Sequence, residues 1–141
     1  MNTPLAMISM IALLGGAVVV QAGQSKDAAI MGTWEGESKC TVVDSPCHDE
    51  HVIYEIMRDE KTGREKIDMY KVVDHEKEFM GTLECIYKAE KANLSCGGGN
   101  PQKKGDWEYF VSGDTMRGSV VVGNDRTLYR KIVVNRTPGR N

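Results

Sequence analysis

Apolar and polar residues alternate at every second position through most of the chain after residue 30, and this period is the feature that most limits the fold. Side chains of a β-strand point to opposite faces in turn, so the pattern is typical of strands with one buried face. No stretch after residue 30 shows a sustained helical period. The residues predicted to point inward in the clearest runs are Trp34, Gly36, Ser38 and Cys40; Phe79, Gly81, Leu83, Cys85 and Tyr87; Trp107, Tyr109 and Val111; Met116, Gly118, Val120 and Val122; and Leu128, Arg130, Ile132 and Val134.

Turn-forming residues separate these runs, for example at 61–63, 112–114 and 123–125, and the glycines at 97–99 suggest a flexible turn. With less regular β-rich runs at 52–58 and 65–73, about eight short antiparallel strands are expected. Such strands form a sandwich or a barrel, and we favour an all-β up-and-down barrel because closure removes exposed sheet edges. We expect one domain over 32–137 and a flexible C-terminus over 138–141.

The N-terminus carries an apolar run from Leu5 to Val20, which is shorter than the roughly 20 residues that span a bilayer as a helix. The run ends before Val20-Gln21-Ala22, which fits a cleavage site, so residues 1–22 are predicted to be a cleaved signal peptide. An uncleaved anchor is the alternative, because the first residues lack Lys and Arg. Cleavage would leave an N-terminal segment at 23–31 and a secreted or periplasmic protein with no stable membrane insertion.

Four cysteines in an exported chain of this size favour disulfides. Three pairings are possible, and we predict the local one, which joins Cys40 to Cys47 and Cys85 to Cys96. Closing loops of this length stabilises a fold by about 2.5–3 kcal/mol each. A four-thiolate zinc site is the alternative, but the sequence lacks the short pairs C-x2-4-C that such sites use.

Gly32-Thr33-Trp34 at the start of the first predicted strand resembles the Gly-x-Trp signature of lipocalins and the wider calycin group. The resemblance implies a barrel whose base is closed by an arginine of the last strand packed across that tryptophan. Arg130 lies in the last predicted strand, in phase with Ile132 and Val134, and is the arginine expected to contact the Trp34 indole.

A second resemblance covers about half of the predicted mature chain. The runs Trp34-x-Gly36-x-Ser38-x-Cys40, 45–50, 52–54 and 80–83 resemble those of a group of uncharacterised small exported bacterial proteins. This likeness supports export and implies no activity.

Six predicted inward aromatic side chains form the first candidate site, a ligand-binding interior. They are Trp34, Tyr54, Phe79, Tyr87, Trp107 and Tyr109. An eight-stranded barrel is either just filled by its side chains or holds one small ligand. Small inward residues such as Gly36 and Gly118 favour a cavity, and a dry core is the alternative.

The run from Cys47 to His51 forms the second candidate site, because it holds the densest group of metal-binding side chains. His48 and His51 would share one face of a helical turn and could bind a metal with Asp49. The alternative is a structural loop held by the Cys40–Cys47 disulfide.

Composition and motifs narrow the function classes. A net charge of −2 argues against nucleic-acid binding. No nucleophile signature or phosphate loop is present in the sequence, so we predict a protein without enzymatic activity or cofactor. The leading hypothesis is binding of a small apolar or amphipathic ligand. The alternatives are a protein partner, as for a secreted protease inhibitor, and metal binding at His48, Asp49 and His51.

Overall fold

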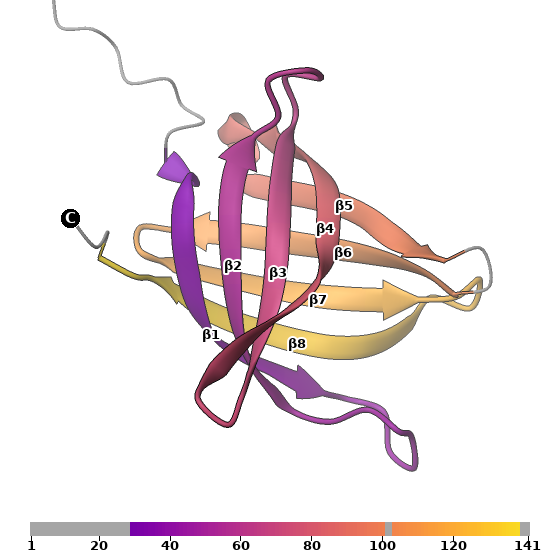
Figure 1. The fold of residues 1–141 in the computed structure, drawn as a ribbon. Helices are drawn as coiled ribbons and strands as arrows, with labels where there is room; N and C mark the ends of the chain where they lie inside the picture. Colours follow the sequence, from indigo (N-terminus) through magenta and orange to yellow (C-terminus); the bar gives the residue numbers. More distant parts are fainter. Residues whose placement is uncertain (1–28, 101–102, 139–141) are drawn as a thin grey trace, which may run out of the picture.

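The computed structural model describes residues 29–100 and 103–138, which form an eight-stranded antiparallel barrel (Figure 1). Each strand pairs with the next, and β8 pairs with β1 to close the barrel. The strands are β1 (Gly32–Cys40), β2 (Glu50–Arg58), β3 (Glu65–Val73), β4 (Glu76–Lys88), β5 (Asn93–Asn100), β6 (Lys103–Ser112), β7 (Thr115–Val122) and β8 (Thr127–Arg136), with a short 3-10 helix η2 (Ala89–Lys91) between β4 and β5. The predicted all-β fold and up-and-down order are confirmed.

The up-and-down order divides the connections between two ends of the barrel. The connections at 59–64, 89–92 and 113–114 lie at one end with residues 29–31, and we call this end the base. The connections at 41–49, 74–75 and 123–126 lie at the other end, which we call the mouth. The predicted signal peptide at 1–22, most of the predicted segment 23–31 and residues 139–141 lie outside the described residues.

Two β-bulges interrupt the side-chain alternation and overturn two sequence predictions. Between β3 and β4 the register shifts at Met80, where Gly81 has a φ of +147°, and between β7 and β8 it shifts at Tyr129. One extra residue moves every following side chain to the other face of the sheet. Phe79 is therefore 62% exposed on the outer face, and Leu128 is also exposed. The prediction that both point inward was wrong.

The barrel interior is packed from the base to the middle. Residue Ile30, which precedes β1, is completely buried among the inward side chains. The buried apolar residues are Ile30, Trp34, Val52, Tyr54, Ile56, Ile67, Leu83, Cys85, Leu94, Cys96, Tyr109, Met116, Val120, Ile132 and Val134. Each strand contributes at least one of them, so the strands share one core.

Both disulfides form with the predicted pairing. Cys40–Cys47 joins the end of β1 to the 41–49 loop at the mouth, with Cα atoms 6.0 Å apart. Cys85 and Cys96 are directly opposite each other on β4 and β5, with Cα atoms 4.1 Å apart, and both are buried. One disulfide therefore fixes a loop at the mouth and the other fixes two strands in the core.

Two of the small residues predicted to point inward, Gly36 and Gly118, do not leave empty space, contrary to the sequence expectation. A Cβ atom on Gly118 would lie 2.3 Å from the ring of Tyr109, and one on Gly36 would lie 2.1 Å from the Val133 carbonyl oxygen. Gly118 thus makes room for a large neighbour, and Gly36 allows β8 to approach closely. The glycines at 97–99 also differ from the expectation, since they continue β5 and pair with β6 instead of forming a turn.

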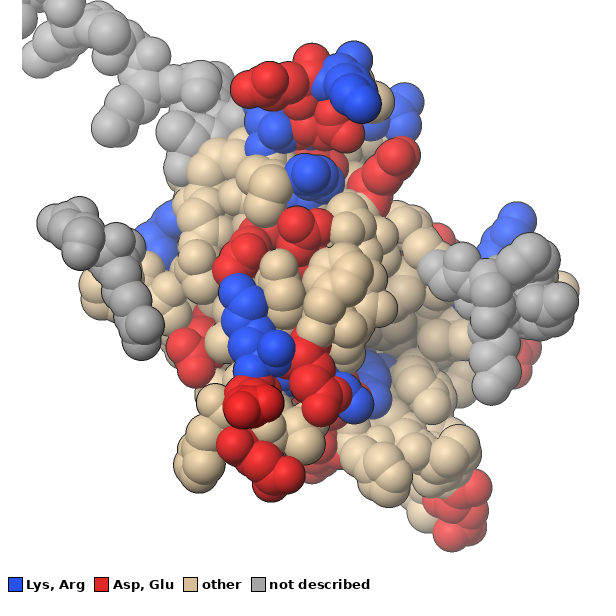
Figure 2. Space-filling view, in the orientation of Figure 1, with Lys and Arg blue, Asp and Glu red and all other residues tan. Residues whose placement is uncertain are grey.

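Acidic and basic side chains intermingle on the outer face that carries β1 to β4 (Figure 2). Ion pairs join Lys71 to Glu78 and Lys77 to Glu55, and a hydrogen bond joins His51 to Glu35. This face therefore presents no large field of one sign. Within residues 29–100 and 103–138, no helix is long and apolar enough to cross a membrane.

Candidate functional site: a pocket at the mouth of the barrel

The base of the barrel is closed by Trp34 and Arg136. The Arg136 guanidinium lies 4.3 Å from the centre of the Trp34 ring, and these residues are opposite each other on β8 and β1. Arg136 also donates hydrogen bonds to the carbonyl oxygens of Met31 and Ala29, while the Trp34 Nε1–H donates to the Ile30 carbonyl oxygen over 2.9 Å. These bonds attach residues 29–31 to the base.

The prediction that Arg130 packs on Trp34 was therefore wrong in the choice of residue. Arg130 pairs with Cys40 at the far end of β1, six positions from the residue that pairs with Trp34. The same inward face of β8 continues through Ile132 and Val134 to Arg136, the last residue of the strand. Continuing the two-residue period to the strand end would have identified Arg136.

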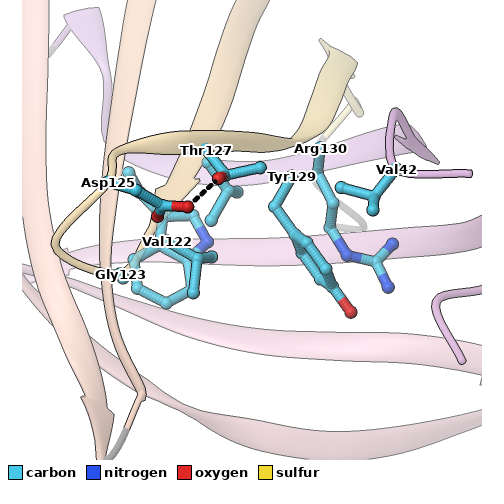
Figure 3. A pocket seen from close by; sticks show the side chains of 10 residues that line it. Val42, Val122, Gly123, Asp125, Thr127, Tyr129 and Arg130 are labelled. Carbon is cyan, nitrogen blue, oxygen red and sulfur yellow. Dashed lines mark hydrogen bonds between the residues drawn. The ribbon is translucent and has the colours of Figure 1, made fainter. Parts of the chain in front are cut away.

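A pocket of about 490 Å³ opens at the mouth, opposite the closed base (Figure 3). Its residues come from β6, β7, β8, the 123–126 turn and the 41–49 loop. They are Val42, Gly105, Trp107, Val120, Val122, Gly123, Asp125, Thr127, Tyr129 and Arg130. The walls are mainly apolar, with a few polar groups at the β8 side, as is common in small-molecule sites.

The indole of Trp107 forms one wall of the pocket, and two glycines leave the space that its ring occupies. Gly98 and Gly105 are opposite each other on β5 and β6. A Cβ atom would lie 3.3 Å from the Trp107 ring at Gly98 and 2.7 Å from it at Gly105. The ring therefore lies directly against the backbone of Gly98 and Gly105, and a side chain at either position would occupy the space that the ring needs.

The bulge in β8 brings Tyr129 and Arg130 to the same side of the strand (Figure 3). Without it, adjacent residues would point to opposite faces. Both side chains line the pocket. Strict alternation would place Tyr129 on the outer face, so its inward direction is a consequence of the bulge.

Arg130 also holds the 41–49 loop against the barrel. Its Nη1 donates to the His48 carbonyl oxygen over 3.0 Å and to the Ser38 hydroxyl over 3.2 Å. The same nitrogen lies 3.5 Å from the Glu50 carboxylate. The Thr41 backbone N–H donates a hydrogen bond to the Tyr129 carbonyl oxygen over 3.0 Å, and this bond continues the β1–β8 pairing past the end of β1.

Two tyrosines close the interior beneath the mouth. The rings of Tyr54 and Tyr109 meet edge to face with centroids 6.0 Å apart. Burial raises the pKa of Tyr54 to about 12, although the positive charge of Arg130 acts to lower it. Burial also raises the pKa of Tyr109 well above its ordinary value. Both rings are therefore neutral parts of the core at ordinary pH.

The six aromatic residues predicted to bind ligand occupy three different environments. Trp107 lines the pocket. Trp34, Tyr54 and Tyr109 are buried in the packed core, and Tyr87 is partly buried against it. Phe79 lies on the outer face because of the bulge in β4. Residues that the sequence reading missed, Val42 and Tyr129, come from a loop and a bulge, where no period indicates side-chain direction.

The predicted metal residues do not form the helical turn that the prediction required. Residues 48 and 49 lie in an irregular loop, and β2 begins at Glu50. Asp49 accepts a hydrogen bond from the Cys40 backbone N–H over 2.8 Å, and His51 Nε2 lies 2.6 Å from Glu35 on the outer face. Among the described residues, no group of three or more His, Cys, Asp or Glu side chains could hold a metal ion.

A larger hollow of about 700 Å³ lies on the outer face, beside Thr33, Glu35, Glu55 and Lys77. Its charged groups are engaged with one another or with neighbours, through Lys77–Glu55 and His51–Glu35. The mouth pocket is the better candidate because its walls are mainly apolar and lie inside the barrel.

Fold and site together define a small disulfide-bonded, eight-stranded barrel with a closed base and an open mouth. The chain matches no protein-family model, and no curated protein shows significant sequence similarity to it.

Proposed function

We propose that this protein is an exported, lipocalin-like binding protein without enzymatic activity, and that it holds a small apolar or amphipathic ligand in the mouth pocket. The observation that carries the proposal is the pocket itself. Its volume of about 490 Å³ falls in the range usual for small-molecule sites. Its main walls are Trp107, Val120 and Val122, which offer apolar surface to a ligand.

Export is supported by two features of the chain. The apolar run at 5–20 has the length of a signal peptide, and both pairs of cysteines form disulfides, which persist in oxidising compartments. The closure of the base by Trp34 and Arg136 supports the lipocalin-like part of the proposal.

Tryptophan fluorescence provides a direct test, because the chain has two tryptophans and only Trp107 lines the pocket. Titration with decanol, a neutral amphipathic probe, is expected to change the tryptophan emission of the native protein. A variant that lacks Trp107 should show no change in emission. Trp107→Phe is the variant to use, since it preserves an aromatic wall. Calorimetry should still detect binding to that variant.

A filled-pocket variant gives the matched control. Val122→Trp places a large side chain in the pocket and should abolish decanol binding. Val121→Trp changes the next residue of β7, which does not line the pocket, and should leave binding intact. Equal affinity in the two variants would show that decanol binds elsewhere, and absence of binding to the native protein would contradict the proposed function.

A further inference from the structure

The mouth pocket contains a cation whose hydrogen-bonding capacity is only partly used. The Arg130 side chain is 16% exposed and lies among mainly apolar walls. All its hydrogen bonds and its ion pair involve one nitrogen, Nη1, which reaches Ser38, His48 and Glu50. Within the described residues, Nε and Nη2 make no hydrogen bond or ion pair.

The anchored nitrogen fixes the direction of the rest of the guanidinium. A guanidinium is planar and presents five N–H donors in a rigid fork. Because Nη1 is held by the Ser38 and His48 oxygens, the Nε–Nη2 edge has a defined position in the mouth. Two parallel N–H groups on one edge match the two oxygens of a carboxylate.

Tyr129 adds a second polar group to the pocket. The bulge in β8 turns its ring to the same side as the Arg130 side chain (Figure 3), and the Arg130 Cζ lies 5.9 Å from the centre of that ring. The Tyr129 hydroxyl makes no hydrogen bond with the described residues. The acidic residue of the pocket, Asp125, lies at the exposed rim, where Thr127 donates a hydrogen bond to it over 2.8 Å.

We propose that the mouth pocket selects an amphipathic monoanion whose carboxylate pairs with the Nε–Nη2 edge of Arg130 and with the Tyr129 hydroxyl, while its apolar part lies against Trp107, Val120 and Val122. The proposal rests on the proposed function and specifies the ligand class. Glu50 balances part of the Arg130 charge from the Nη1 side, and the ligand supplies the oxygens that the other edge lacks.

The test compares three probes with the same alkyl chain, decanoate, decanol and decylammonium, each below its micelle concentration and near neutral pH. Calorimetry is expected to show that decanoate binds the native protein roughly ten- to a hundredfold more tightly than decanol, since hydrogen bonds to charged groups are strong. Arg130→Gln should remove this preference by weakening decanoate alone. Tyr129→Phe, which keeps the ring, should weaken decanoate by a few-fold and leave decanol unchanged.

The outcomes separate the ligand class from the binding function. Equal affinity of decanoate and decanol for the native protein, or tighter binding of decylammonium, overturns the anionic ligand and leaves the proposed function standing. Loss of both ligands in Arg130→Gln, with an unchanged Tm, would mean that Arg130 only shapes the mouth, and it would also overturn the proposal. Binding of none of the three probes to the native protein contradicts both. If Arg130→Gln does not fold, Tyr129→Phe and the native protein still decide.

Discussion

The base and the mouth of the barrel each combine one tryptophan with one arginine of β8, but the two pairs are engaged differently. At the base, Trp34 is completely buried and Arg136 lies over its ring. At the mouth, Trp107 is partly buried and lines a pocket with Arg130. The base pair stabilises the closed end of the barrel, whereas the mouth pair leaves an indole face and one guanidinium edge available. The packed base and the open pocket thus use the same residue types at opposite ends.

The strongest test of this difference is removal of each tryptophan. Trp34→Ala is expected to lower the free energy of unfolding by about 3–5 kcal/mol, because it leaves a large cavity and a carbonyl of Ile30 without its donor. Trp107→Ala should cost only about 1–2 kcal/mol, because its ring is already partly exposed to the pocket. Urea unfolding measures both values. Equal losses would show that the mouth is packed as tightly as the base.

Alkaline pH should weaken the core beneath the mouth. The pKa of Tyr54 is about 12 in the folded protein and 10.0 is its ordinary value, so the unfolded chain loses the proton first as pH rises. Stability from this residue is fully present below pH 10 and decreases by about 2–3 kcal/mol as pH rises to about 12.

Tm measured across this pH range, together with tyrosinate absorbance, checks the prediction. Tyr54→Phe removes the ionisable hydroxyl and should make Tm decrease less steeply with rising pH. Part of the pH dependence of Tm should remain, because burial also raises the pKa of Tyr109. If the native protein and Tyr54→Phe lost stability with the same slope, the pKa of Tyr54 would not be raised in the folded protein.

Removal of the base arginine should affect stability without affecting binding. Arg136→Gln loses the contact with the Trp34 ring and the bonds to residues 29 and 31, so we expect a loss of about 2 kcal/mol. Decanoate affinity, measured by calorimetry, should stay within about twofold of the native value, because the mouth lies at the other end of the barrel. A drop as large as that of Arg130→Gln would contradict the separation of the two ends.

The smallest effect is expected from the glycine beneath the Trp107 ring. Gly105→Ala places a Cβ atom 2.7 Å from the indole, which can yield toward the pocket, so the cost should be about 1 kcal/mol. Gly118→Ala is the control in the core, where the Tyr109 ring lies 2.3 Å from the added atom and is fully enclosed. The control should cost up to about 3 kcal/mol. Chemical denaturation of the two variants gives the comparison, and a larger loss for Gly105→Ala would contradict it.

The strands and disulfides were readable from the sequence because they follow local rules. Alternation identified the inward faces of β1, β6 and β7, and the spacing of the cysteines favoured the local pairing that the structure contains. The two bulges could not be predicted from the sequence. One extra residue leaves the composition almost unchanged, and the short runs on either side of it still alternate regularly. Phe79 and Leu128 were therefore assigned to the wrong face.

The pocket depends on the same kind of non-local information. The small residue Gly118 suggested empty space, but the ring of Tyr109 fills it, and only the assembled barrel shows which large side chain reaches which glycine. Tyr129 was missed because the bulge determines its direction. Arg136 carried a usable signal, since it continues the inward face of β8 to the end of the strand.

The bulge at Tyr129 inserts one residue between two regularly paired parts of β8. Residues 130–136 have their phase set by pairing with β1, up to the closure at the base. Deleting Tyr129 would restore strict alternation, with Leu128 still on the outer face next to an inward Arg130, and would remove the tyrosine from the mouth. Leu128 stays paired with Val121 and Arg130 with Val120, and Arg136 keeps its place over Trp34. The set of side chains that lines the mouth can thus be altered by a change in chain length that leaves the base of the barrel unchanged.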